Sequence, residues 1–357
     1  MLLADRAPSH PAEHRRAINE DDPLHVRAFA GIEPCLQCPL QGDEDRFARR
    51  HRCNEAVGDV RLDDVEDFGE QLGLVAELVI QGAPADTVAG PEVTTHPPVV
   101  LLHAFLMNGA VWSRVADLLA DRGIRSYAPD LPLGAHPTPM HRDADQSPRG
   151  IAGQVLTVLE ALDLHNVTLV GSDTGGALVQ FVLDVDTQRI GRVVLTNCDA
   201  FDTFPPFPFT VVFGLLRGPL RMKLNLIPMR SRAFRHSPLG FGLLANELDA
   251  KLTRSWIEPA LAHRSIRDDA VRFLQAMDPD ELLDVSTRLK NYRGQVRILW
   301  GTADRAFTPN IGRRLQQAFV DASLVEVPHA RTLVQLDAPE LLADQIADFE
   351  ATPPSRS

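Results

Sequence analysis

The chain has 357 residues, of which 44% are apolar and 24% charged, proportions that exclude a globally disordered protein and fit one large core. Acidic residues outnumber basic ones by 48 to 36. The resulting net charge of -12 disfavours nucleic acid and anionic lipid as partners over most of the surface. We therefore expect one or two globular domains without a nucleic-acid or membrane partner.

Residues 1–65 are rich in proline, histidine, arginine and acidic side chains, with no sustained period of 2 or 3.6 residues, and we predict a poorly ordered extension. Three cysteines lie here, Cys35, Cys38 and Cys53. They lack a second paired motif, so reduced thiols are expected rather than a zinc site. The first 30 residues contain no apolar core of a secretory signal, and a cytoplasmic location is the default expectation.

From residue 72 onward, short β-type runs alternate with helical patterns, which is typical of a parallel sheet covered on both faces. The apolar runs predict strands at 99–102, 124–128, 167–170, 193–196 and 296–300. Helical spacing predicts helices near 111–119, 151–162, 175–183 and 311–319. The sequence thus indicates an α/β core made of residues 66–200 and 291–351.

Residues 201–290 interrupt this alternation. They begin with a run of phenylalanine and proline, Phe201 to Phe209, and continue as helix without strands. Such an insertion is predicted to form an apolar helical lid over a pocket at the carboxyl ends of the strands. The longest apolar runs, Pro97–Met107 and Phe209–Leu216, are shorter than the roughly 20 residues of a membrane span, so no transmembrane helix is expected.

The strongest chemical signal is the segment Val170-Gly171-Ser172-Asp173-Thr174-Gly175-Gly176, in which a strand runs through glycines into a helix. This is the context of a nucleophile elbow, where flanking glycines leave room for a sharp turn. The centre of the Gly-x-nucleophile-x-Gly spacing is Asp173. Ser172 lies one position too early, so a serine esterase requires a shifted motif and stays an alternative.

This segment resembles the α/β-hydrolase family, and specifically its branch with an aspartate nucleophile, which includes haloalkane dehalogenases and epoxide hydrolases. The resemblance covers about residues 72–350. Three further segments match in the expected order: His103-Ala104-Phe105, Leu299 to Asp304, and Val327 to Ala330. The resemblance implies an α/β-hydrolase fold with a catalytic triad of Asp173, Asp304 and His329.

The resemblance also implies an oxyanion hole built from backbone N–H groups of Ala104 or Phe105 and of Thr174. Asp199, just past the strand at 193–196, lies where some members of the dehalogenase branch place the triad acid, so it remains an alternative to Asp304. No cofactor and no metal is implied.

An aspartate nucleophile restricts the reactions that the enzyme is expected to catalyse. A carboxylate is ionised at neutral pH without the help of a base, and the start of a helix is expected to favour its charged form further. Attack on an acyl carbon gives an unstable anhydride, whereas attack on an sp3 carbon displaces a halide or opens an epoxide and leaves an alkyl ester. His329 then activates water against that ester, with Asp304 orienting the imidazole.

The leaving group is less well specified. Thr174 stands where dehalogenases of this branch usually have a halide-binding tryptophan, which leaves Trp112, Trp256 and Asn108 as candidate donors. Epoxide hydrolases of this branch use lid tyrosines, and Tyr127 and Tyr292 both lie outside the lid proper. The sequence favours a small apolar substrate, with dehalogenation ahead of epoxide opening.

Two other functions stay open at this point: a cofactor-free oxygenase or luciferase-like enzyme, and a ligand-binding receptor without turnover on the same fold. The natural substrate, the oligomeric state and a role for residues 1–65 are not specified by the sequence.

Overall fold

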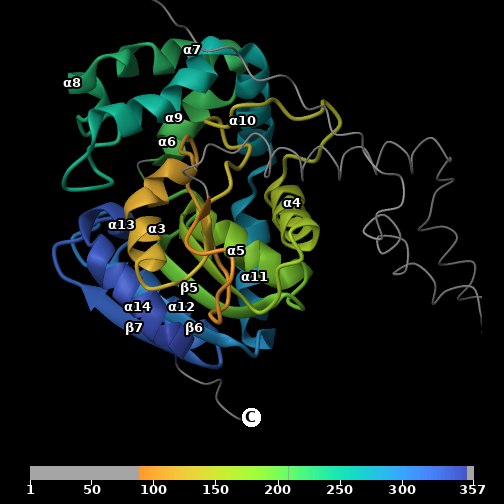
Figure 1. Cartoon of the computed structure of the whole chain (residues 1–357). Helices are drawn as coiled ribbons and strands as arrows, with labels where there is room; N and C mark the ends of the chain where they lie inside the picture. The colour runs from red at the N-terminus through yellow and green to blue at the C-terminus, as the bar shows by residue number, and fades with distance from the viewer. Residues whose placement is uncertain (1–87, 208, 352–357) are drawn as a thin grey trace, which may run out of the picture. The chain divides into compact units, whose positions relative to one another are not determined.

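The computed structural model describes residues 88–207 and 209–351, and a seven-stranded sheet forms its centre (Figure 1). The strand order is β1-β3-β2-β4-β5-β6-β7. β1 is antiparallel to β3 and all other neighbours are parallel. The strands are β1 (Val88–Ala89), β2 (Val99–Leu102), β3 (Ser126–Tyr127), β4 (Val167–Asp173), β5 (Ile190–Cys198), β6 (Gln295–Gly301) and β7 (Ala322–Val327).

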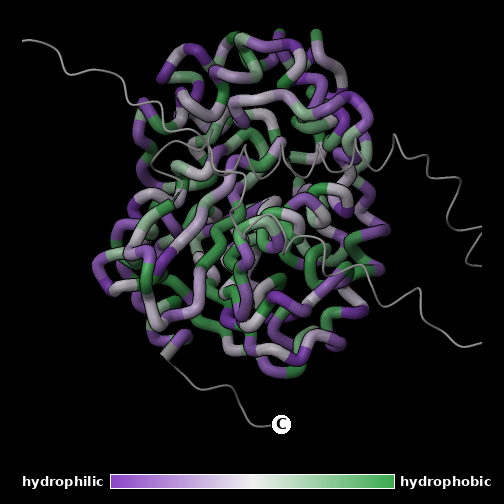
Figure 2. Tube along the Cα trace, turned by 45° about the vertical axis from the view of Figure 1, so that its right-hand side comes forward, coloured by the Kyte–Doolittle hydropathy of each residue, from purple (hydrophilic) through white to green (hydrophobic). Residues whose placement is uncertain are grey.

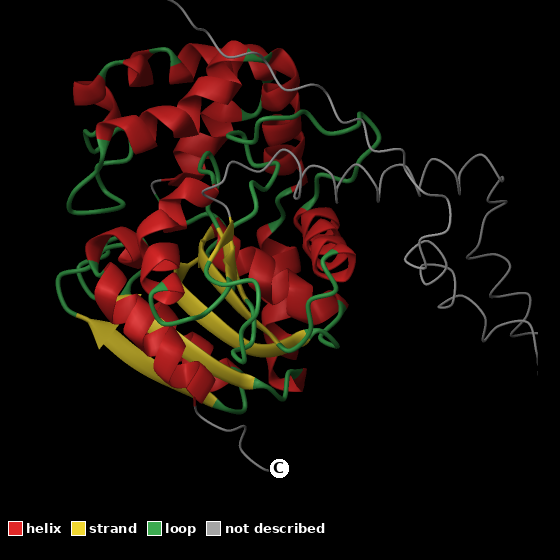
Figure 3. Cartoon of the chain, in the orientation of Figure 1, coloured by secondary structure: helices red, strands yellow, loops and turns green. Residues whose placement is uncertain are grey.

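Helices cover both faces of this sheet (Figures 1 and 3). On one face α3 packs against α14, and on the other α5 packs against both α4 and α11. The helices of this core are α3 (Ser113–Ala120), α4 (Pro148–Ala161), α5 (Thr174–Val185), α11 (Pro279–Arg288), α12 (Pro309–Ala318), α13 (Val334–Asp337) and α14 (Pro339–Ala351), with short 3-10 turns η3 (Gly109–Trp112) and η5 (Leu289–Asn291). The α/β-hydrolase architecture expected from the sequence is confirmed.

Three strands differ from the expectation, and one of them, β1, was not predicted. β3 is shorter than predicted, because only Ser126 and Tyr127 pair with β1 and β2. β7 was not predicted at all. It lies at the edge of the sheet with most side chains half-buried or exposed, so its sequence lacks the continuous apolar run that identified β2 and β4.

The inserted region between β5 and β6 forms a helical layer above the carboxyl ends of the strands (Figure 1). It consists of α6 (Phe209–Leu216), α7 (Pro219–Leu226), η4 (Pro228–Arg230), α8 (Arg232–Arg235), α9 (Ala250–Ala262) and α10 (Arg264–Ala276). Figure 2 shows apolar segments running through the core and recurring within this layer. Because α11 packs against α5, the lid ends before α11 rather than at residue 290.

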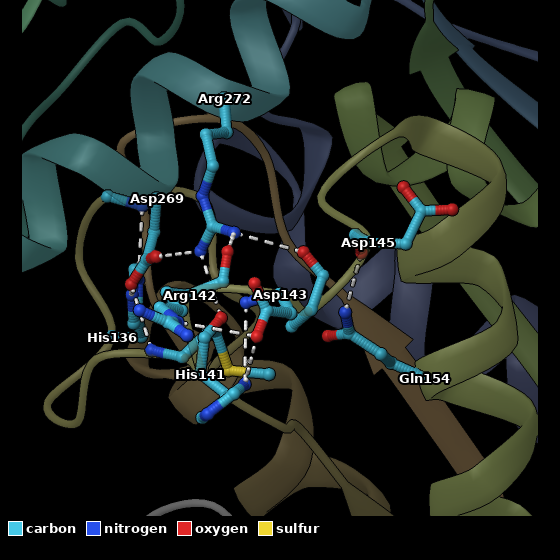
Figure 4. A network of polar contacts seen from close by, with 11 residues as sticks. His136, His141, Arg142, Asp143, Asp145, Gln154, Asp269 and Arg272 are labelled. Carbon is cyan, nitrogen blue, oxygen red and sulfur yellow. Dashed lines mark hydrogen bonds and ion pairs between the residues drawn. The ribbon is translucent and has the colours of Figure 1, made fainter. Parts of the chain in front are cut away.

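A buried polar network ties the lid to the core (Figure 4). Asp269 on α10 lies 3.1 Å from His136 Nε2 and 2.6 Å from Arg272 Nη2, and it accepts a backbone hydrogen bond from Met140. Burial alone would raise the pKa of Asp269, but these three partners together hold it below its usual value. The loop between β3 and α4 is thereby fastened to α10.

Among the described residues, no helix has the length and apolarity needed to cross a bilayer.

Candidate active site

The strand, sharp turn and helix that the sequence predicts around Asp173 are present. β4 ends at Asp173, α5 begins at the next residue, and Asp173 has φ 55° and ψ -127°, a strained conformation for a residue other than glycine. A Cβ on Gly175 would lie 2.3 Å from the carbonyl oxygen of Leu102, and one on Gly171 would lie 2.5 Å from that of Gly175. The turn therefore requires both glycines, and it presents the Asp173 side chain at the end of the strand.

Asp173 borders a cavity of about 280 Å³ between the sheet and the lid. The described lining residues are apolar except for Asp173, Asp199 and Asn225. The apolar lining comes from the segment after β2, from Phe307, and from the lid: Phe105, Leu106, Met107, Pro205, Pro206, Phe209, Val212, Phe213, Leu215, Leu216, Leu226, Met229, Phe234, Leu239, Phe241, Leu244 and Phe307. Ser172 is fully buried and does not border this cavity.

Asp173 Oδ1 accepts hydrogen bonds from the backbone N–H of Thr174 at 2.6 Å and from the Thr174 hydroxyl at 3.1 Å. Burial and, to a lesser extent, the nearby Asp304 raise the pKa of Asp173 to about 6, against these two hydrogen bonds. The expectation that the helix start would favour the charged form is thus outweighed by desolvation. Asp173 is still mostly ionised at pH 7.

Asp199 is the second carboxyl group of this cavity. It follows β5, whose Cys198 is in register with Asp173, and its side chain is 1% exposed with Oδ1 lacking a hydrogen-bond partner. Burial and repulsion from Asp173 raise the pKa of Asp199 well above its usual value. Of the two neighbouring carboxyl groups, Asp199 therefore holds a proton more readily than Asp173.

Asp304 lies at the end of β6 and accepts four hydrogen bonds. Oδ2 accepts from Asn197 Nδ2 at 3.0 Å and Thr332 Oγ1 at 2.8 Å, and Oδ1 accepts from the backbone N–H groups of Ala306 and Phe307. Burial raises the pKa of Asp304, and these hydrogen bonds limit the rise. The carboxylate is held rigidly, which suits a group that orients another side chain.

His329 borders a neighbouring cleft of about 730 Å³ that Asp304 also borders. Its backbone has φ 66°, its carbonyl oxygen accepts from Asn246 Nδ2 at 2.8 Å, and its side chain is exposed. The imidazole makes no hydrogen bond to Asp304, Asp199 or Asp173 in this structure. Asp304 and His329 thus border the cleft of about 730 Å³, whereas Asp173 and Asp199 border the apolar cavity of about 280 Å³.

The predicted oxyanion segment is fixed by a buried histidine. Leu131 donates its backbone N–H to His103 Nε2 at 2.8 Å, so the ring proton lies on Nδ1, which donates to the Ala104 carbonyl at 2.9 Å. Burial lowers the pKa of His103 and keeps it neutral. The ring holds Ala104 and Phe105 in place beside the cavity.

The leaving-group candidates named from the sequence lie elsewhere. Trp112 and Trp256 are fully buried outside the cavity lining, and Asn108 donates to Ser255 Oγ at 3.1 Å. Tyr127 is on β3, and Tyr292 packs edge-on against Phe319. Beyond the two carboxyl groups, the cavity offers only Asn225, whose amide nitrogen already donates to the Arg221 carbonyl.

Three polar contributions were not predicted: the Thr174 hydroxyl on Asp173, and the bonds from Asn197 and Thr332 to Asp304. Asn197 is 107 residues from Asp304 along the chain, and no local pattern indicates that pairing. Cys198 is fully buried, as expected of a small apolar residue in a strand. Cys35, Cys38 and Cys53 lie outside the described residues.

A sequence model of the alpha/beta hydrolase fold matches residues 97–339. The chain belongs to the α/β-hydrolase family. This hydrolase is 26% identical over 253 residues to a 2-hydroxy-6-oxononadienedioate/2-hydroxy-6-oxononatrienedioate hydrolase of Cupriavidus pinatubonensis, covering 67% of this chain and 80% of that one.

Solved structures of the same fold include the haloalkane dehalogenase DbeA from Bradyrhizobium elkani, with a TM-score of 0.60, 16% identity, and coverage of 74% of this chain and 92% of that one. The epoxide hydrolase CorEH aligns with a TM-score of 0.57 and 18% identity over 74% of this chain and 93% of that one. At these sequence identities, the two similarities show only that this hydrolase shares the fold of those enzymes.

Proposed function

We propose that this hydrolase attacks an sp3 carbon of a small apolar substrate with the Asp173 carboxylate and hydrolyses the resulting alkyl ester. The observation that carries the proposal is that Asp173, and not Ser172, stands at the strained turn and borders the apolar cavity. A carboxylate there is ionised at neutral pH and needs no base to act as a nucleophile. The apolar lining suits an uncharged substrate.

In the first step an Asp173 oxygen forms a bond to the substrate carbon while the bond to the leaving atom breaks. In the second step a water oxygen attacks Asp173 Cγ, His329 accepts the water proton, and the negative charge forms on the former carboxyl oxygen. Backbone N–H groups of Thr174 and of Ala104 or Phe105 are proposed to stabilise that charge. Collapse releases the alkoxide, which takes its proton from the imidazolium, and leaves Asp173 as a carboxylic acid. Asp173 becomes a carboxylate again by losing this second water proton, to solvent after halide loss or back to Asp199 after epoxide opening.

The second step requires His329 to turn inward from its exposed position. Asp304 is the proposed partner of the imidazole, because the two residues border the same cleft and Asp304 is held by four hydrogen bonds. Asp199 is less suited to this role, since it borders the cavity of Asp173 and burial raises its pKa, which disfavours the charged form that would stabilise an imidazolium.

The leaving group is better matched by an epoxide than by a halide, which reverses the order favoured by the sequence. No tryptophan borders the cavity in the described residues, and Asn225 has its amide nitrogen occupied. Asp199 is the remaining candidate donor, and its raised pKa favours the protonated form that this role requires. A neutral carboxyl group can give a proton to the alkoxide formed on ring opening, whereas a departing halide needs no proton.

The dicarboxylate named in the Cupriavidus relative is a second candidate substrate, and the cavity argues against it. Two carboxyl groups and no arginine, lysine or histidine are found among the described residues that line the cavity. A dianionic substrate would meet the charge of Asp173 without a compensating cation. We therefore place the substrate among uncharged molecules.

Trapping the ester tests the proposal directly. His329→Ala should permit the first step and block the second, so incubation with a panel of epoxides and haloalkanes is expected to add the mass of one substrate-derived group per chain. An epoxide adds a hydroxyalkyl group and a haloalkane an alkyl group, and peptide mapping is expected to find it on Asp173. Intact-protein mass spectrometry gives the first result.

The control is a double variant, His329→Ala with Asp173→Asn, which should stay unmodified. A group mapped to Ser172 would overturn the proposal in favour of an esterase. Absence of any adduct would also count against it, and oxygen uptake or ligand-induced stabilisation without product would then identify an oxygenase or a receptor.

The first step should depend on pH through Asp173. In His329→Ala the rate of adduct formation is expected to be constant above about pH 7 and to fall roughly tenfold per pH unit below about 6, because only the ionised carboxylate reacts. Single-turnover measurement by quenched mass spectrometry would give this profile. A rate that stays constant down to about pH 5 would show that burial does not raise this pKa.

A further inference from the structure

The outer helices of the lid carry an apolar surface that no described residue covers. Seven of the thirteen exposed large apolar side chains of the described residues fall between 207 and 227. Leu220 and Leu224 on α7 are 69% and 57% exposed, and Val211 and Leu215 on α6 are 59% and 53% exposed. We define the lid face as a set of exposed side chains on and around these two helices: Val211, Val212, Leu215, Arg217, Leu220, Arg221, Lys223, Leu224, Ile227, Arg230 and Arg232.

The lid face is also positively charged in an acidic protein. Residues 203–246 contain no aspartate or glutamate and six lysines and arginines. The rest of the described chain, residues 88–202 and 247–351, has 30 acidic and 20 basic side chains and is therefore acidic. Five of the six cations, Arg217, Arg221, Lys223, Arg230 and Arg232, are exposed, and none forms an ion pair with another described residue.

The apolar part of the lid face is continuous with the cavity. Val212 and Leu215 on α6 are exposed to solvent and also line the cavity that holds Asp173. On α7, Asn225 and Leu226 line the same cavity, and the two helices pack against each other. A molecule that contacts the lid face therefore lies beside the entrance to the site.

We propose that the lid face docks on an anionic lipid bilayer, although the net charge of the whole chain led us to expect no membrane partner. Exposed aliphatic side chains interleaved with unpaired lysine and arginine match the acyl boundary and the anionic headgroups of such a surface. The acidic rest of the described chain is repelled by the same headgroups, so among the described residues the lid face is the part that approaches them. A second copy of the chain is a poorer occupant, because a two-fold contact would set five cations against five.

This orientation brings the cavity entrance to the bilayer, where apolar molecules accumulate. The hydrolase would then take its substrate from the membrane rather than from water. Docking itself does not depend on the chemistry at Asp173. Failure of the trapping experiment and failure of docking are therefore separate results.

Co-sedimentation of the full chain with vesicles tests the inference. We expect binding to vesicles with about 30% phosphatidylglycerol in phosphatidylcholine, little binding to phosphatidylcholine alone, and loss of binding as salt rises to about 0.5 M. The double variant Arg221→Glu with Lys223→Glu should lower the apparent affinity at least tenfold.

The matched control is Lys290→Glu with Arg293→Glu, which makes the same change in net charge at exposed positions before β6, at the opposite end of the sheet. It should change the affinity by less than about twofold. Thermal melting checks that both variants fold. The inference is overturned if the wild type ignores anionic vesicles, if both variants lose affinity equally, or if light scattering shows a lipid-free dimer that only the lid variant abolishes.

Discussion

Asp173→Asn is expected to lower kcat/KM by a factor of about 10⁴ or more on any substrate that the wild type turns over, because the variant has no carboxylate to form the ester. Steady-state assays with the best substrate of the panel measure this loss. The amide nearly matches the carboxylate in shape and can keep an oxygen toward the backbone N–H of Thr174. Activity within about tenfold of the wild type would remove Asp173 from the nucleophile position.

The same substitution is expected to stabilise the fold at neutral pH. A carboxyl group whose pKa is raised from 3.8 to about 6 destabilises the native state once it ionises, and this shift corresponds to about 3 kcal/mol above pH 7. The native state binds the Asp173 proton more tightly than the unfolded state does. The stability that protonated Asp173 contributes is therefore lost as the pH rises from 3.8 through about 6. Urea unfolding should show a gain for Asp173→Asn at pH 7.5 that falls to roughly half at pH 5.

Gly175→Ala is expected to lower the free energy of unfolding by about 3 kcal/mol or more, although it adds only one methyl group. The new Cβ would lie 2.3 Å from the Leu102 carbonyl oxygen and 2.8 Å from that of His103, and both are backbone atoms that cannot rotate away. The elbow and the oxyanion segment would have to separate. Chemical denaturation measures the change in the free energy of unfolding.

Gly153→Ala is the matched control. Gly153 lies inside α4, and a Cβ there would meet no atom within 4 Å. Alanine is expected to stabilise this helix by about 0.5–1 kcal/mol by reducing the entropy of the unfolded chain. If the two substitutions changed stability alike, crowding at the elbow would not be the cause.

The strands that position Asp173 could be predicted because they are buried on both faces. β2 consists of continuous apolar residues, β4 and β5 each contain a short apolar run, and the glycines at 171 and 175 mark the turn at the end of β4. These features are local in sequence, and they were sufficient for the fold and for the position of Asp173 in the cavity.

The electrostatics of the site could not be predicted in this way. The pKa of Asp173 depends on how deeply the lid buries it, and the lid lies more than 30 residues further along the chain. From the sequence, Asp199 could be predicted only as an alternative triad acid. Its proximity to Asp173 arises from the pairing of β4 with β5, which turns two separate aspartates into one coupled pair.

The network around Asp269 gives the lid a hinge. α10 is anchored to the loop between β3 and α4 by the contacts of Asp269 with His136 and Met140, and by hydrogen bonds from Arg272 to carbonyl oxygens of that loop. The described residues of α6 and α7 have no comparable ion pair. Opening of the cavity should therefore be one-sided, with α6 and α7 moving about a fixed α10. Amide hydrogen exchange would then be faster in α6 and α7 than in α10, and a substrate would always enter from the same side of Asp173.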